Sequence, residues 1–241
     1  MEERALRELE LWQVAKLFGQ APGAGSETTH EAAGADAVPA APGDASLVPI
    51  VLERVSTASL DELRVIAAGC TACGLHAHRK QAVFGTGAED AAWMFVGEGP
   101  GADEDEQGEP FVGQSGKLLD SMLAAIGCKR GREVYIANVV KCRPPGNRTP
   151  TPAEANACAP YLDRQIEWVA PKVIVALGKS AAMRLLGTEA SLASLRGRVH
   201  RYKDIPVVVT YHPSYLLRTL PEKAKAWEDL LFARRVLAGA P

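Results

Sequence analysis

The sequence has no long apolar run, because none approaches the roughly 18 residues that a membrane-spanning helix needs. The first ten residues are rich in charge and lack the apolar stretch of a secretory signal peptide. Neither sign of charge dominates: 27 Lys and Arg stand against 29 Asp and Glu, and the net charge of −2 does not indicate a nucleic-acid partner. The hydrophobic share of 47% is ordinary for a globular protein. We therefore expect a cytoplasmic protein that does not enter a membrane.

The chain divides by composition into a short acidic part and a larger part. Residues 1–55 contain 4 Lys and Arg against 9 Asp and Glu, whereas residues 56–241 contain 23 against 20. Residues 1–18 have the apolar spacing of an amphipathic helix. Residues 19–55 are rich in Ala, Gly, Pro and Ser, which bury too little apolar surface to fold, so we expect a flexible linker. A single folded domain is expected over 56–241.

Short apolar runs alternate with helical stretches through this domain. The runs lie at 92–96, 134–140, 173–177 and 207–211, and the helical stretches at 58–69, 115–126, 152–169, 179–186 and 222–238. This alternation is typical of a mostly parallel sheet with helices on both faces. The sequence therefore predicts an α/β fold around four strands.

Polar residues follow the ends of these strands. Glu98 comes after the first strand, Asn138 closes the second, and His212 follows the fourth. Ligands of open α/β sheets bind beyond the carboxyl ends of the strands. A carboxylate, an amide and an imidazole are therefore expected at one rim, although polar loop residues without any function are the plainer alternative.

Four of the five cysteines form a pattern. Cys70 and Cys73 make a close pair whose thiolates a short turn can point at one metal ion or cluster corner. Cys142 is expected at a strand end and Cys158 inside a helix, so the four meet only through the fold. In a reducing compartment paired cysteines are more often metal ligands than disulfides. The alternative is that Cys142 and Cys158 are ordinary buried thiols.

Two histidines leave a zinc site open as an alternative. His76 and His78 closely follow the cysteine pair, and tetrahedral thiolate sites suit both zinc and iron–sulfur clusters. Histidines in such loops are also commonly just exposed residues. Cys128 has no partner in spacing and is expected to be structural.

Four motifs, in order, resemble those of the family 4 uracil-DNA glycosylases. They are Gly-Glu-Gly-Pro-Gly at 97–101, Pro-Phe-Val-Gly at 110–113, Asn-Val-Val-Lys-Cys-Arg-Pro-Pro at 138–145 and His-Pro-Ser-Tyr-Leu-Leu-Arg at 212–218. The resemblance covers roughly residues 60–238. It implies a three-layer αβα sandwich with a central, mostly parallel four-stranded sheet. It also implies a monofunctional enzyme that hydrolyses the bond between uracil and deoxyribose, leaving an abasic site for base-excision repair.

The resemblance extends to the cysteines. Their order, a close pair followed by two distant residues, is similar to that of the family's ligands for a [4Fe-4S] cluster, which assigns this role to Cys70, Cys73, Cys142 and Cys158. One related group of enzymes, which becomes covalently attached to DNA, carries a basic insertion with a reactive histidine after the strand that corresponds to the one closed by Asn138. Residues 139–147 contain no such insertion. This favours an enzyme that completes repeated catalytic cycles over one that stays attached to DNA.

The same resemblance assigns roles in the pocket. Phe111 is expected to stack on the uracil that is rotated out of the DNA. Asn138 offers both a donor and an acceptor to the base edge, and cytosine presents the opposite pattern. Glu98 is expected to orient the attacking water, and His212 to donate to a uracil carbonyl as charge develops on the leaving base. The expected site is catalytic at Glu98 and His212 and uracil-binding at Gly97, Gly99, Phe111, Asn138 and His212.

Contacts to the DNA are expected beside this pocket. The segment Tyr215, Leu216, Leu217 and Arg218 is expected to supply an apolar wedge and a cation for phosphate, and Lys117 a further phosphate contact near a helix start. The expected partner is uracil-containing DNA, single- or double-stranded, bound by a monomer. The segment 1–55 is expected to tether another repair or replication protein.

Two other functions remain open on the sequence. One is a related base-excising enzyme that acts on deaminated purines or thymine mismatches, which shares the fold. The other is a non-catalytic iron–sulfur or zinc module that binds nucleic acid. A binding module does not need Glu98, Phe111, Asn138 and His212 together, so their presence argues against it.

Overall fold

The structure, a computed structural model, describes residues 54–239. The predicted helix at 1–18 and all but the last two residues of the predicted linker lie outside this range. Arg54 and Val55 are helical, and Val55 is buried, so the folded part of the chain includes both. Within 54–239 no helix is long and apolar enough to cross a membrane.

One sheet organises the described residues. Its strands are β1 (Thr86–Gly87), β2 (Trp93–Gly97), β3 (Val134–Asn138), β4 (Val173–Leu177), β5 (His200–Tyr202) and β6 (Ile205–Thr210), in the order β1-β3-β2-β4-β6-β5. The four inner strands are parallel, and the short edge strands β1 and β5 pair antiparallel. The sheet is therefore mixed.

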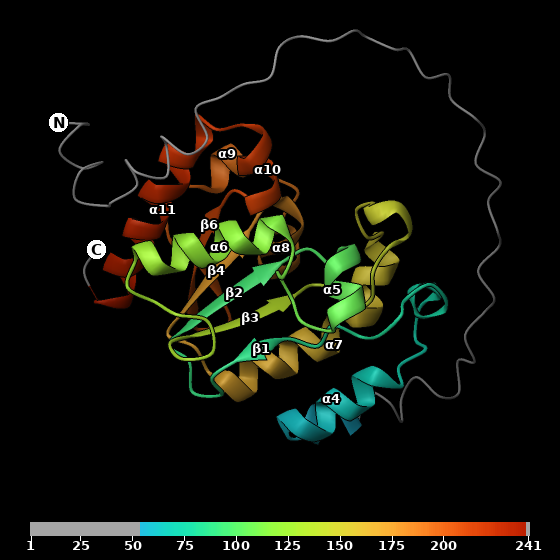
Figure 1. Cartoon of the computed structure of the whole chain (residues 1–241). Coiled ribbons are helices and arrows are strands. Elements are labelled where there is room, and N and C mark those ends of the chain that lie inside the picture. The colour runs from blue at the N-terminus through green and yellow to red at the C-terminus, as the bar shows by residue number, and fades with distance from the viewer. Residues whose placement is uncertain (1–53, 240–241) are drawn as a thin grey trace, which may run out of the picture. The chain divides into compact units, whose positions relative to one another are not determined.

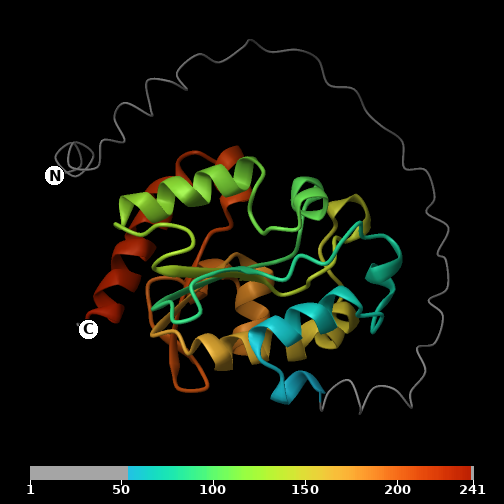
Figure 2. The ribbon, with the colours of Figure 1, turned by 60° about the horizontal axis from the view of Figure 1, so that its bottom comes forward.

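Helices cover both faces of this sheet (Figure 1). They are α4 (Leu60–Ala68), α5 (Ala102–Gln107), α6 (Gln114–Ala125), α7 (Pro152–Val169), α8 (Lys179–Leu186), α9 (Leu192–Leu195), α10 (Pro213–Arg218) and α11 (Glu222–Leu237), with short 3-10 turns η1 (Gly74–Ala77) and η2 (Pro145–Asn147). Figure 2 shows the sheet nearly edge-on, with α6 on one side and α4 and α7 on the other.

Alternate residues of the inner strands serve the two faces. Met94 and Val96 of β2 join the core under α4, α7 and α8, whereas Trp93 and Phe95 join the core under α6 and α11. Because helices cover both faces of the sheet, the sequences of these strands are continuous apolar runs rather than an alternation of apolar and polar residues. The apolar runs are long enough for strands and too short for helices, which made the inner strands predictable.

The predicted α/β class is confirmed, whereas the predicted number of four strands is wrong. The four predicted runs are the inner strands β2, β3, β4 and β6, within a few residues at each end. The two missed strands span only two and three residues, and none of their residues is fully buried. Edge strands this short carry no apolar run, so periodicity gives no signal for them.

Candidate functional site

A cavity of about 680 Å³ opens at the carboxyl ends of β2, β3, β4 and β6. It collects most of the residues that the sequence predicted for the site, although they are far apart in the chain. Those that line it are Glu98, Gly99, Phe111, Asn138, His212, Tyr215 and Arg218, while Gly97, Lys117, Leu216 and Leu217 do not.

Gly97 does not line the cavity, but the side chains of Asn138 and Phe111, which do, pack directly against it. A Cβ atom at this position would overlap Asn138 Oδ1 and would come within 2.7 Å of Phe111 Cε2. The Asn138 side chain is buried, and its Oδ1 has no hydrogen-bond partner in the described residues. A buried acceptor left without a donor is costly, typically about 1–3 kcal/mol. Asn138 therefore lines the cavity and carries a buried acceptor that is not yet satisfied.

Phe111 has an unusual backbone, with φ of 56°. This left-handed conformation is rare for a bulky residue and costs about 1–3 kcal/mol, so surrounding contacts must hold it in place. Here Arg130 does so, because its guanidinium donates to the carbonyls of Pro110 (2.7 Å) and Phe111 (2.8 Å). The Phe111 carbonyl also packs so closely on α6 that Gly116 has no room for a Cβ atom. The ring is thereby held over Gly97.

His212 is the N-cap of α10 and faces Phe111, with ring centroids 5.5 Å apart at 31°. Its Nδ1 accepts the backbone N–H of Ser214 at 3.2 Å and lies 2.9 Å from the Ser214 hydroxyl. Burial, and then the nearby Arg218 guanidinium, lower the pKa of His212 to about 4. The ring is therefore neutral near pH 7. With Nδ1 accepting, the proton is assigned to Nε2.

Glu98 follows β2, and its carboxylate accepts a hydrogen bond from the hydroxyl of Ser180. Ser180 lies in the first turn of α8 and lines the same cavity. The bond fixes which way the carboxylate faces, so Glu98 is held at the cavity rather than free in solvent.

Sequence reasoning missed three residues that shape this site: Ser180, Arg130 and Glu104. Glu104 Oε1 accepts the N–H groups of Val112 and Gly113 at 3.0 Å each, and its Oε2 accepts that of Gly101. It thus joins the loop after β2 to the Phe111 loop. A hydroxyl and a carboxylate in the first turn of a helix were visible signals for Ser180 and Glu104. The position of Arg130 gives none.

The predicted DNA-binding segment forms α10, which was not predicted as a helix. Leu216 is only 1% exposed, whereas Leu217 is 41% exposed. Residues of one helix one position apart face different sides, so Leu216 packs inward and the expected wedge is limited to the exposed residues. Tyr215, Arg218 and Lys117 are exposed. Lys179 and Arg148, not predicted, add cations at the cavity.

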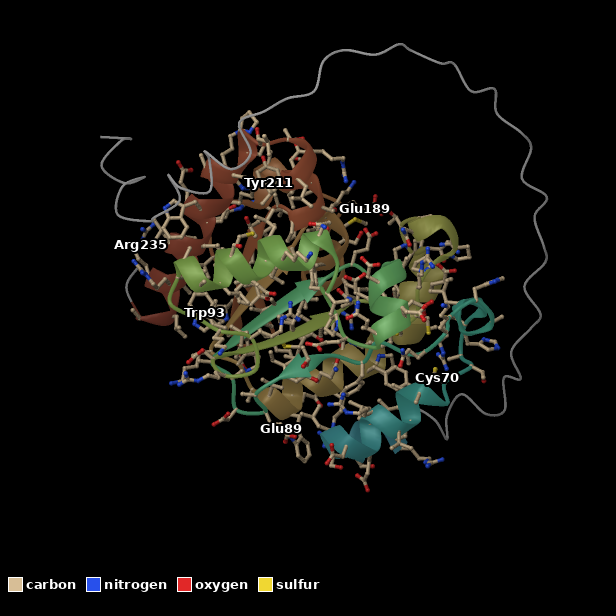
Figure 3. The ribbon with its side chains drawn as sticks, viewed as in Figure 1. Cys70, Glu89, Trp93, Glu189, Tyr211 and Arg235 are labelled. Atoms are coloured by element: carbon tan, nitrogen blue, oxygen red, sulfur yellow. The ribbon has the colours of Figure 1, made fainter. Side chains whose placement is uncertain are left out.

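The four predicted cysteine ligands line a second, small cavity. Cys70 lies at the end of α4 (Figure 3), Cys73 precedes η1, Cys142 follows β3 and Cys158 belongs to α7. Burial raises the pKa of the Cys158 thiol to about 12. Within residues 54–239, no three His, Cys, Asp or Glu side chains form a group that could hold a metal ion.

Cations and donors surround this second cavity. Arg79 Nη1 donates to Cys142 Sγ at 2.9 Å, and the Lys141 backbone N–H donates to Cys158 Sγ at 3.3 Å. Such donors suit thiolate sulfur, since they stabilise negative charge on it. His76 also lines the cavity, but its Nδ1 is engaged with the Cys73 carbonyl at 2.7 Å.

His78 and Cys128 lie away from the cysteine cavity. Neither His78 nor Cys128 lines the second cavity. Cys128 is buried in the core under α6 and α11, on the other face of the sheet, in agreement with its expected structural role.

The sequence of the chain matches a known class of protein. Residues 84–231 match the family model of the uracil DNA glycosylase superfamily. The Type-4 uracil-DNA glycosylase of Thermotoga maritima is 50% identical over 174 residues, which are 71% of this chain and 84% of the relative. The type-4 enzyme of Archaeoglobus fulgidus is 46% identical over 66% of this chain and 83% of the relative. The type-4 enzyme of Pyrobaculum aerophilum is 42% identical over 71% of this chain and 91% of the relative.

The match spans well over half of the chain and includes β2, β3, β4, β6 and the cavity that their ends form. The chain belongs to the uracil DNA glycosylase superfamily. Within that superfamily it belongs to the type-4 family, as the sequence motifs predicted.

Proposed function

We propose that this chain hydrolyses the N-glycosidic bond of uracil in DNA, releasing uracil and leaving an abasic site in base-excision repair. Family membership supports the reaction class. The observation that supports uracil as the substrate is the buried, unpartnered Oδ1 of Asn138, a residue that lines the cavity. Uracil has an N–H on its N3 edge that satisfies such an acceptor, whereas cytosine has a bare nitrogen there.

Binding begins with the base outside the DNA stack. Rotating a nucleotide out costs a few kcal/mol, and stacking on Phe111 recovers part of it. The left-handed backbone holds that ring in place before the base arrives, so little ordering entropy is lost on binding. Asn138 then selects uracil, because its amide supplies the acceptor for N3–H and a donor for the adjacent carbonyl. Gly97 leaves room for both side chains, and Gly99 brings backbone to the cavity.

Bond cleavage leaves negative charge on the departing uracil and positive character on the sugar. The neutral His212 ring donates from Nε2 to a uracil carbonyl, where the negative charge develops. Glu98 accepts a proton from the attacking water and faces the sugar's positive character. Ser180 orients that carboxylate for this role. No step requires a charged imidazole.

The DNA strand is held at the rim. Arg218 and Lys117 contact phosphates, and the exposed Tyr215 and Leu217 fill the gap that the rotated nucleotide leaves. The proposed substrate is uracil-containing DNA, single- or double-stranded. The proposed active form is a monomer.

A [4Fe-4S] cluster is the proposed occupant of the cysteine cavity. Four thiols from separate elements lie around one space, and Arg79 and Lys141 donate to two of the sulfurs. A cluster presents four iron corners to four thiolates, and the four cysteines that line this cavity can supply them. When bound, the cluster ties residues 70–158 together, and no step of the hydrolysis uses it.

The cluster is tested by metal analysis of anaerobically purified protein. About four irons per chain and broad absorbance near 400 nm are expected. Cys142→Ala should lose the iron and fold poorly. Cys128→Ala, the matched change of a buried cysteine outside the cavity, should keep it. Stoichiometric zinc without iron in the unaltered protein would contradict the assignment.

The reaction is tested by release of free base from a labelled oligonucleotide under single-turnover conditions. Uracil should be released from both single and double strands, while hypoxanthine and mismatched thymine should not. Glu98→Ala should slow release with little change in DNA affinity. Binding of uracil-containing DNA without release of uracil would contradict the proposal and favour a non-catalytic module.

A further inference from the structure

Lys141 carries a buried charge between the two cavities. The residue is 2% exposed, and its ammonium donates to the Asn138 carbonyl at 2.8 Å and to Gln165 Oε1 at 2.6 Å. Both acceptors are neutral. Lys141 takes part in no ion pair with the residues from 54 to 239. The Asp163 carboxylate favours the charged form of Lys141 without forming an ion pair with it, and Asp163 is itself paired with Arg184. A buried cation without a paired countercharge is strongly destabilising, so a further anionic group is expected beside it.

The cysteine cavity supplies that anion. Lys141 lines it, and its own N–H donates to Cys158 Sγ. A [4Fe-4S] core with four thiolates has a net charge of about −2 when oxidised. Lys141 and Arg79, which contacts Cys142 Sγ, carry two positive charges between them. The two cations therefore match the charge that the proposed cluster brings.

Of these two cations, Lys141 alone bonds to a residue that lines the other cavity. Its second function is to hold the carbonyl of Asn138, the last residue of β3, whose amide faces the proposed uracil pocket. Arg79 instead donates from Nη2 to the Ala68 carbonyl, at the end of α4 and away from that pocket. Both cations can balance the charge of the proposed cluster, but only Lys141 of the two holds the Asn138 carbonyl.

We infer that Lys141 couples the metal centre to uracil recognition: it is a countercharge of the cluster and a positioning residue for Asn138. Without the anion, the buried ammonium loses its electrostatic support and with it the fixed position of the Asn138 carbonyl. The inference rests on the proposed function for its second half and on the proposed cluster for its first.

The test compares three variants of the full, cluster-loaded chain: Arg79→Met, Lys141→Arg and Lys141→Met. Two quantities are measured for each, the reduction potential of the cluster and the inhibition constant of free uracil against excision. Iron content shows that each variant is loaded. Removing a positive charge disfavours adding an electron, so both Met variants should have a lower potential, whereas Lys141→Arg keeps the charge and the potential.

Uracil affinity should follow a different pattern. Losing the bond to the Asn138 carbonyl should raise the inhibition constant about fivefold to tenfold in Lys141→Met, the range expected for one buried hydrogen bond. Lys141→Arg should show a similar rise, because a planar guanidinium does not reproduce the position of an ammonium. Arg79→Met should leave it unchanged.

Each departure from this pattern has a definite meaning. Normal uracil affinity in both Lys141 variants would overturn the positioning role, and an unchanged potential in Lys141→Met would overturn the countercharge role. If Lys141→Met does not fold, Lys141→Arg still tests the positioning role and Arg79→Met provides its control. If the unaltered protein released no uracil, the proposed function would fail, while the potentials would still test the countercharge.

Discussion

The hydroxyl of Ser180 donates a hydrogen bond to Oε2 of Glu98, and so joins the first turn of α8 to the loop after β2. The two residues lie 82 positions apart in the chain. The bond occupies one carboxylate oxygen and leaves the other for a water molecule. Catalysis by Glu98 should therefore depend on Ser180, although Ser180 does not itself act on the substrate.

Replacing Ser180 by Ala should lower the maximal single-turnover rate of uracil release about tenfold, because the carboxylate is no longer held in one orientation. Half-saturation by DNA should not change. Ser180→Thr, which keeps the hydroxyl, should restore most of the rate. Ser194→Ala is the matched control, since that exposed hydroxyl bonds only to its own turn. An equal loss in Ser180→Thr would show that the side chain matters only for packing.

The neutral His212 ring gives a prediction about pH. Its pKa is lowered to about 4 from the usual 6.5, so the ring stays neutral as pH falls through 6.5 and gains a proton only near 4. The excision rate should therefore show no inflection near pH 6.5. A rate profile that bends near pH 6.5, and loses that bend in His212→Gln, would contradict the assigned protonation state.

The same shift predicts how stability changes with pH. The unfolded chain binds a proton at His212 near pH 6.5, whereas the folded chain does so only near pH 4. Between these values the unfolded state holds more protons, so this residue's contribution to folding falls as pH falls from 6.5 to 4. Denaturant titrations of the unaltered protein and His212→Gln should converge across this window.

The close approach of Phe111 to α6 gives a prediction about Gly116. A methyl group there would overlap the Phe111 carbonyl, so Gly116→Ala should displace the Phe111 loop and cost about 1–3 kcal/mol of stability, together with most uracil affinity. Gly74→Ala is the matched control, because nothing lies within 4 Å of its Cβ position. Denaturant unfolding and uracil inhibition of both variants test this. Equal effects at the two positions would refute the packing argument.

Many of the helices and strands could be predicted from local sequence patterns. Residues 152–169 were predicted as a helix and form α7 with the same ends, because Thr151 and Pro152 provide a strong start signal. Residues 179–186 form α8 as predicted, closed by Gly187. The strand ends that gather Glu98, Asn138 and His212 followed from the rule that parallel strands share one carboxyl edge.

The contacts that hold the site together were not readable. Arg130 reaches the Phe111 carbonyl from 19 positions away, and Lys141 meets Gln165 across 24. Such bonds depend on where whole elements pack, which no local pattern encodes. The inward turn of Leu216 was missed for the same reason: its direction depends on α10 being a helix.

The most direct test of the account is a change of base selectivity at Asn138. Single-turnover release of uracil and of cytosine should be measured from matched oligonucleotides for the unaltered protein and for Asn138→Asp. A carboxyl group can donate from its protonated form or accept from the cytosine amine in its ionised form, so the variant should release cytosine, which the unaltered protein leaves intact. Its uracil release should fall at the same time. Unchanged selectivity, with uracil released at the normal rate and cytosine still intact, would show that Asn138 does not recognise the base.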